Sequence, residues 1–283
     1  MKWLMFLVVF STASAQLAPV DLPEYGMATT TVRRGKLQVE ALSRLGYRSD
    51  GRPYVGGFTS GREIEYHGVD VVALWGILDR WDIGIRVSYD AFNIQAFYID
   101  LSDGPTRHYL KSDLSWTSVP LSLITRAGLV NGRGLVPSVA LRMTLTLDDY
   151  TDDIDFDSSS FVRGDVTLAL MNRIGEKSEI GYGIGIAGIG GGSHGSGETG
   201  HYWIGVLAPV GRYILAGPGI SGEFAAGATG YNPVESRTWF GASARIHPES
   251  WPLLHFSGRL CRGFEGEFNY ELTLGAAVAS FEM

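Results

Sequence analysis

The chain has 283 residues, of which 45% are hydrophobic and 12% aromatic, and its formal net charge is −7. This acidic balance, without any run of basic residues, excludes the electrostatic footprint of a nucleic-acid-binding protein, so we expect no nucleic acid among its partners. The single cysteine, Cys261, excludes an intramolecular disulfide, and the sequence has no zinc spacing, haem motif or phosphate-binding loop, so we expect no metal and no cofactor.

Residues 1–15 have the three parts of a cleaved signal peptide. Met1-Lys2 is a short charged start, residues 3–10 are apolar, and Ala13-Ser14-Ala15 offers the small residues of a cleavage site. The apolar run is too short for a transmembrane helix, and no later stretch holds the roughly eighteen consecutive apolar residues that such a helix needs. The remaining classes are a soluble exported protein and a closed β-barrel.

Residues 16–34 contain Pro19 and Pro23 and follow no clear period. We assign them to an N-terminal segment in the periplasm, which could serve as a plug. No linker-like shift in composition divides residues 35–283, so we expect them to form one domain.

The stretch 81–91 has apolar or aromatic residues at its odd positions and Asp82, Gly84, Arg86, Ser88 and Asp90 at its even ones. This period of two predicts a strand with two unlike faces. At ~3.3 Å per residue and a tilt of ~40°, it would span about 28 Å, close to the ~25 Å apolar band of an outer-membrane barrel. Trp81 and Tyr89 stand at its ends, as aromatic rings do at membrane interfaces. A half-buried strand of a soluble sandwich would show the same alternation.

The alternation recurs in segments 37–47, 136–147, 162–174, 238–247, 253–262 and 268–278. Sandwich strands average about five or six residues, and these segments are longer. Short joints also alternate with longer connections, as turns and external loops do in outer-membrane barrels. The short joints lie near 78–80, 175–178, 210–212 and 247–251, and the longer connections are 48–62, 93–108, 148–160, 190–198 and 230–236.

Weaker strands near 64–78, 111–126, 178–190, 199–210 and 212–227 bring the total to twelve. We therefore predict an all-β fold, a single antiparallel up-and-down transmembrane β-barrel with both termini in the periplasm. Ten strands are the alternative, because the pattern changes phase at Val119-Pro120 and Pro218 interrupts another candidate. Gly181, Gly183 and Gly185 would leave one inner wall bare, so either the lumen is open there or another segment, such as residues 16–34, packs against it.

The run 31–40 (TVRRGKLQVE), the segment 135–141 (LVPSVAL) and the closing alternation into Phe281 resemble the family of outer-membrane transporters associated with meta-pathway phenol degradation. The resemblance implies an outer-membrane barrel that passes small, aromatic or hydrophobic solutes, and it supplies no catalytic residues. Barrels of this kind usually end in an aromatic residue, whereas here Glu282-Met283 follows Phe281, so the assembly signal is imperfect. The expected partners are outer-membrane lipid and lipopolysaccharide, the assembly machinery and a small-molecule solute.

The ionisable residues of the strands are expected to face inward, because a Lys or Arg on the lipid face at mid-bilayer costs ~2–4 kcal/mol. The predicted lumen-lining residues are Glu40, Arg44, Asp82, Arg86, Arg142, Arg163, Asp165, Arg245, Arg259, Glu267 and Glu271. Their mixed signs favour ion pairs over a single-sign selectivity filter. A barrel of this size lies between filled and water-filled barrels, which predicts a narrow conduit for small solutes.

Two functions other than transport are alternatives, a membrane-embedded hydrolase and a structural or adhesive surface protein. A membrane-embedded hydrolase would need His and Ser two residues apart on a strand, which His194 and Ser196 offer only within a glycine-rich loop. His255 and Ser257 repeat this spacing without an identifiable acidic partner, so we expect no catalytic residue and no enzyme.

The acidic stretch 148–157 lacks the glycine and the closing Glu of an EF-hand, and we interpret it as a solvated external loop. A structural or adhesive surface barrel is the third class.

Overall fold

The computed structural model describes residues 31–55, 58–100, 108–132, 136–152, 157–174, 178–190, 197–227, 237–246, 253–262 and 268–282. Thirteen strand segments within them form one sheet: β1 (Lys36–Val55), β2 (Phe58–Leu78), β3 (Trp81–Asp100), β4 (His108–Ser118), β5 (Leu121–Val130), β6 (Ser138–Asp152), β7 (Asp157–Ile174), β8 (Ser178–Gly190), β9 (Gly197–Pro209), β10 (Ile214–Gly227), β11 (Arg237–Ile246), β12 (Leu253–Arg262) and β13 (Phe268–Glu282). In these parts of the chain, no helix is long and apolar enough to cross a membrane. The predicted signal peptide lies outside the described residues.

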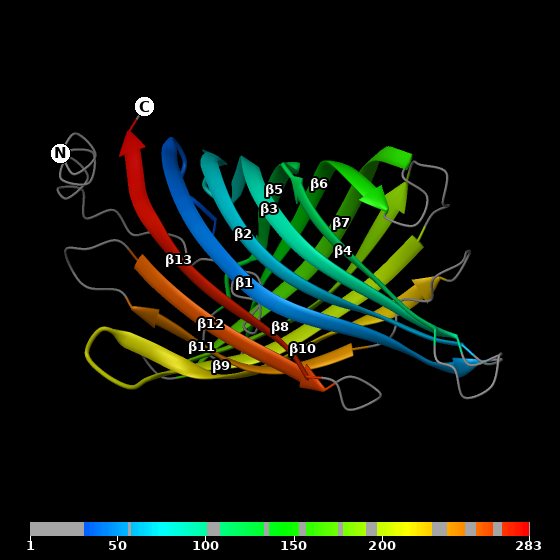
Figure 1. Cartoon of the computed structure of the whole chain (residues 1–283). Helices are drawn as coiled ribbons and strands as arrows, with labels where there is room; N and C mark the ends of the chain where they lie inside the picture. Colours follow the sequence, from blue (N-terminus) through cyan, green and yellow to red (C-terminus); the bar gives the residue numbers. More distant parts are fainter. Residues whose placement is uncertain are drawn as a thin grey trace, which may run out of the picture.

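The sheet closes on itself as a barrel (Figure 1). Every pairing is antiparallel, β1 lies between β2 and β13, and the additional pairing of β2 with β3 closes the ring. β4 and β5 are two parts of one wall strand, because β3 pairs with β5 from Trp81 to Val87 and with β4 from Asp90 to Asp100. The wall therefore has twelve strands, which confirms the predicted antiparallel barrel and its interruption at Val119-Pro120.

β3 shows which face of the wall is which. Asp82 is fully buried, whereas its neighbours Trp81 and Ile83 are 44% and 38% exposed. The same alternation places large apolar residues on the outside of the other strands, among them Val69, Val71, Leu123, Leu145, Val166, Ile184, Ile204 and Leu272. A soluble sandwich would bury such residues and expose the charged ones. The reversed arrangement is that of a barrel whose outer face meets hydrocarbon.

The two ends of the wall differ in their connections. Lys36 at the start of β1 lies opposite Glu282 at the end of β13, so we call this end the terminal rim and the opposite end the far rim. Short turns join strands at the terminal rim, as between Leu78 and Trp81, where two residues suffice. Pro218 lies within β10, opposite Ala242 of β11, so this candidate strand exists despite its proline.

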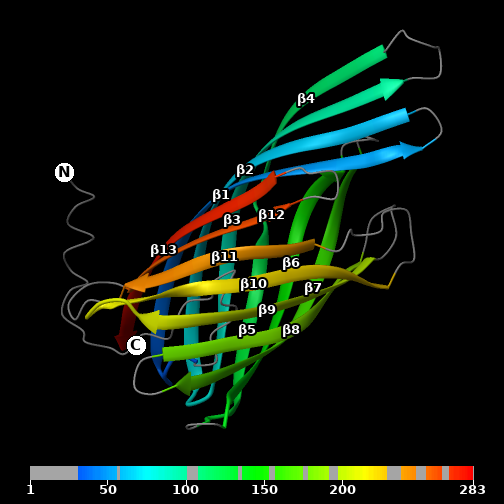
Figure 2. The same cartoon turned by 90° about the horizontal axis from the view of Figure 1, so that it is seen from below.

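Three of the five predicted longer connections are wrong in extent, because strands occupy much of them. Residues 48–55 and 58–62 continue the β1–β2 ladder out to the pair Val55 and Phe58, and residues 93–100 continue β3 beside β4. Residues 148–152 and 157–160 likewise extend β6 and β7, with Asp152 opposite Asp157. Beyond the apolar band neither face of a strand has to be apolar, so the period of two disappears while the ladder continues. Figure 2 shows β1 to β4 reaching outward together as an extension of the wall.

Candidate functional site

Glycines on the inner wall let a side chain of one strand cross the next strand. Gly183 of β8 lies between Trp203 of β9 and Ala169 of β7 in the register, and a Cβ at Gly183 would collide with the Trp203 ring. The ring packs against Ala169 and against Ala140 of β6. At Gly183, the inner wall that sequence reasoning left bare is therefore covered by a ring from the neighbouring strand.

His201 of β9 crosses β8 in the same way, over Gly185. Its Nε2 lies 3.1 Å from the hydroxyl oxygen of Thr167 on β7, and its Nδ1 lies 3.6 Å from a carboxylate oxygen of Asp165. The Thr167 hydroxyl also donates to Asp165 at 2.6 Å. This crossing is polar, whereas that of Trp203 is apolar.

On the opposite side of the ring, Arg44 of β1 crosses β2 over Gly68 to reach β3. Its Nη2 donates to Asp70 and to Asp90, at 2.9 Å in each case. Asp70 is buried and Asp90 is partly buried, so one guanidinium balances two carboxylates in the wall. Such charge-assisted bonds hold three strands in register.

A second polar crossing lies beside it. Tyr66 of β2 lies over Gly46 of β1 and donates its hydroxyl to Glu271 of β13. Arg259 of β12 donates to the same carboxylate at 3.0 Å, and its guanidinium stands 4.7 Å from the ring centroid of Trp239. An ion pair, a phenol and an indole therefore meet on this part of the wall.

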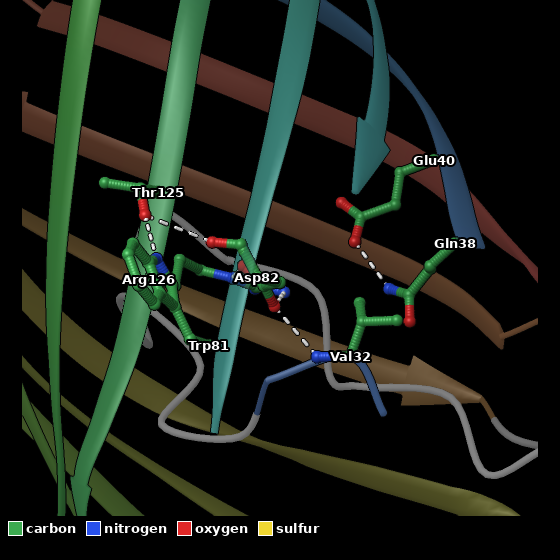
Figure 3. A network of polar contacts seen from close by, with 7 residues as sticks. All are labelled: Val32, Gln38, Glu40, Trp81, Asp82, Thr125 and Arg126. Carbon is green, nitrogen blue, oxygen red and sulfur yellow. Dashed lines mark hydrogen bonds and ion pairs between the residues drawn. The ribbon is translucent and has the colours of Figure 1, made fainter. Parts of the chain in front are cut away.

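The terminal rim contains the most deeply buried ion pair that the described residues show (Figure 3). Arg126 of β5 donates from Nε and Nη2 to the two carboxylate oxygens of Asp82, at 3.0 and 2.8 Å. The side chains are 2% and 0% exposed. The backbone N–H of Val32 donates to Asp82 at 2.8 Å, so this carboxylate also binds the chain that precedes β1.

That chain lies against the inside of the wall. Val32 is buried in a cluster with Val72 and Leu74 of β2 and Ile124 of β5. A Cβ at Gly76 would collide with the carbonyls of Val32 and Arg33, and the Gly35 N–H donates to the Gly76 carbonyl at 2.8 Å. Gly35 has φ of +72°, a left-handed conformation that glycine adopts without strain. Residues 32–35 are thus fixed inside the terminal rim.

Two other polar contacts lie close to this rim. Arg245 of β11 reaches past β10 and β9 to Glu179 of β8 at 3.2 Å, and Arg173 lies 3.8 Å from the same carboxylate group. Gln38 donates to Glu40 at 2.7 Å within β1. Charges here are paired within the wall, and no single sign dominates.

The structure places the predicted lumen residues as follows. Glu40, Asp82, Arg245 and Glu271 are buried on the inner face, Arg44, Arg86, Arg142, Asp165 and Arg259 are partly buried, Arg163 is exposed, and Glu267 lies outside the described residues. Sequence reasoning missed Tyr66, Asp70, Asp90, Arg126 and Glu179, which complete these contacts. The sequence contained a signal for Arg126, because Leu121, Leu123 and Leu129 occupy odd positions of this strand and Arg126 occupies an even one, on the opposite face.

The residues considered for catalysis show no such assembly. His194 and Ser196 lie outside the described residues, and His255 is fully buried, with its ring over Gly275. No group of three or more His, Cys, Asp or Glu side chains among the described residues could hold a metal ion.

Toward the far rim, the described residues of β4 and β6 do not pair with each other. β5 pairs with β6 as far as Leu121 and Leu147; above them β6 pairs only with β7, and β4 pairs only with β3. The strand that would bridge them turns at Val119-Pro120, where the Pro120 carbonyl accepts from the N–H of Ser88 at 3.0 Å. Tyr89, which follows Ser88, is the outward-facing aromatic residue of β3 at the far-rim side of the apolar band, whereas Trp81 stands at the terminal rim. The break therefore begins where the apolar band ends.

No family model and no curated protein matches the sequence, but solved structures do. An outer-membrane channel of the COG4313 group from Pseudomonas putida F1 aligns at a TM-score of 0.60 and 12% identity, over 92% of this chain and 100% of that one. The transport unit of the autotransporter AIDA-I from Escherichia coli aligns at 0.57 and 7% identity, over 99% and 97%. This chain has the fold of outer-membrane barrels. At these identities the likeness shows the fold alone, and that fold serves more than one function.

Proposed function

We propose that this protein is a narrow outer-membrane channel for small hydrophobic or aromatic solutes, with its terminal rim in the periplasm. The observation that carries the proposal is the break in the wall between β4 and β6, which lies at the far-rim edge of the apolar exterior. A sheet edge that faces lipid leaves backbone N–H and C=O groups without hydrogen bonds, which is costly. Such an edge is therefore expected to be covered or to serve a function. A solute dissolved in the bilayer would pass between the bilayer and the lumen through this break between β4 and β6.

The inner wall supports the same conclusion. Its ion pairs, Arg44 with Asp70 and Asp90, Arg259 with Glu271 and Arg126 with Asp82, balance charge locally. A selectivity filter for ions would instead present one sign of charge to the lumen. The lumen therefore suits neutral solutes, and we expect a low ionic conductance. The similarity to a COG4313 outer-membrane channel agrees with this function, and phenols are one solute class that the sequence resemblance suggests.

We further propose that residues 16–34 close the terminal rim. Their last part, Val32 to Arg34, already lies inside the barrel and is bound by Asp82 and Gly76. Deletion of residues 16–30, with the signal peptide retained, should raise the conductance of the purified protein in planar bilayers. An unchanged conductance would show that this segment does not limit passage.

The lateral route can be tested by closing it. Val119→Cys and Asp149→Cys, in a Cys261→Ser background, would place thiols at positions that the Leu121–Leu147 register would set opposite each other. We expect cells that produce the variant to take up toluene faster than cells without the protein, and oxidation to remove this gain while dithiothreitol restores it. Glycerol uptake is the control for a water-filled path.

Two outcomes of this experiment would contradict the proposal. Toluene uptake that is insensitive to oxidation would reject the lateral route and leave a conduit through the far rim. Uptake that never exceeds that of cells without the protein would reject transport altogether. Heat-modifiable migration on a gel and fractionation with the outer membrane test the proposed location and its lipid partners independently.

A further inference from the structure

Two pairs of hydroxyl side chains lie opposite each other on neighbouring strands, and only one of the pairs is hydrogen-bonded. Ser122 of β5 lies directly opposite Thr146 of β6, and their oxygens are 2.9 Å apart, a hydrogen bond. Ser257 of β12 lies directly opposite Thr273 of β13. The oxygens of this second pair are buried and have no hydrogen-bond partner among the described residues.

The absence of a partner is costly at this depth. Ser257 is 7% exposed and Thr273 is 4% exposed. Buried polar groups in folded proteins are nearly always hydrogen-bonded to the protein or to water, so these two hydroxyls have the capacity to bind a further partner. Residues directly opposite each other on antiparallel strands have Cβ atoms ~4.5–5.5 Å apart, so both hydroxyls can reach the same oxygen atom of a third molecule.

The surroundings indicate the charge of that molecule. Arg259 follows two residues after Ser257 and is paired with Glu271, and Arg44, opposite Thr273, is paired with Asp70 and Asp90. Each of these neighbouring arginines is therefore already engaged by a carboxylate. A neutral group can bind here without disturbing these pairs, whereas an anion would compete with Glu271 for Arg259.

We propose that Ser257 and Thr273 form a recognition site for the hydroxyl or carbonyl oxygen of a neutral solute that passes through the lumen. Each hydroxyl can both donate and accept a hydrogen bond, which matches an alcohol group. Both oxygens are buried in this structure, so binding of the solute requires neighbouring side chains to move. The site deepens the proposed channel function and rests on it for its biological role.

The test is a binding measurement on the purified protein in detergent, with benzyl alcohol, toluene and benzoate as probes followed by saturation-transfer NMR. The variant S257A/T273V removes the unpaired hydroxyls with little change in shape. The matched control S122A/T146V removes the pair that is already bonded. We expect S257A/T273V to weaken benzyl alcohol binding about fivefold to tenfold, the equivalent of one or two neutral hydrogen bonds, and to leave toluene unchanged.

Every other outcome counts against the site. Equal losses for benzyl alcohol and toluene would assign a packing role to the two residues, and no loss would mean that water alone occupies the position. Tighter binding of benzoate that depends on Ser257 and Thr273 would reject the neutral assignment. Because binding is measured without transport, a protein that fails to pass solutes but shows the expected losses would reject the channel function and retain the site.

Discussion

The inner wall uses one device, a side chain that crosses a glycine, for two different purposes. On β1 to β3 the crossing side chains are Arg44 and Tyr66, and each reaches a carboxylate two strands away. On β8 the main crossing side chain is Trp203, which reaches alanines. We call the first region, together with the adjoining ion pair of Asp82 on β3 and Arg126 on β5, the charge arc, and the second region the ring arc. The comparison shows that a wall of this curvature can be filled either by paired charges or by an aromatic ring laid over small residues, provided that a glycine separates the partners.

The charge arc should be the more sensitive to losing one partner. Arg126→Ala would leave the Asp82 carboxylate fully buried without its cation, which typically costs about 3–5 kcal/mol. We expect a corresponding loss in a urea titration of the folded, heat-modifiable form in detergent. Arg163→Ala, at an exposed position of β7, is the control and should leave the transition unchanged. Similar transitions for both variants would mean that water enters the terminal rim and solvates Asp82.

The ring arc should lose less, because its partners are apolar. Trp203→Ala leaves only a void beside Ala140 and Ala169, with no unpaired charge. Large core truncations cost up to ~5 kcal/mol, and on a wall that borders a lumen we expect about 2–3 kcal/mol. The same urea titration measures it. A loss larger than that of Arg126→Ala would reverse the comparison and make the ring the principal support of the wall.

Sequence reasoning could predict the alternation of these strands and not the partners within it. Residues 81–91 contain the full pattern, and each even position there faces inward in the structure, because one register satisfies lipid outside and polar groups inside. Which acid meets Arg44 depends on strand order and stagger, since Asp90 lies two strands away. The glycines carried a usable signal, because a ladder of bare positions requires a large neighbour, but the sequence did not indicate that the neighbour is Trp203.

The glycine itself can be tested where only side chains cross it. A Cβ at Gly185 would meet the His201 ring and the Thr167 hydroxyl, with no backbone atom among its nearest contacts. Gly185→Ala should therefore cost about 1–2 kcal/mol through overpacking, and His201→Ala should recover most of it in a double-mutant cycle. Additive losses would show that the two residues do not share this space and that the glycine serves the backbone alone.

The smallest effect is expected within the charge arc, at a carboxylate that shares its cation. Asp70→Asn keeps a hydrogen-bond acceptor for Arg44, and Asp90 still balances the guanidinium at 2.9 Å. We expect a loss of about 1 kcal/mol, that of weakening one charge-assisted bond to a neutral one. Asp82→Asn, measured in parallel, should cost more, because it removes the charge from an ion pair whose two side chains are only 2% and 0% exposed. Equal losses at the two sites would mean that Asp70 and Asp82 depend on their arginine partners to the same extent. The charge arc would then behave as one connected network rather than as two separate clusters.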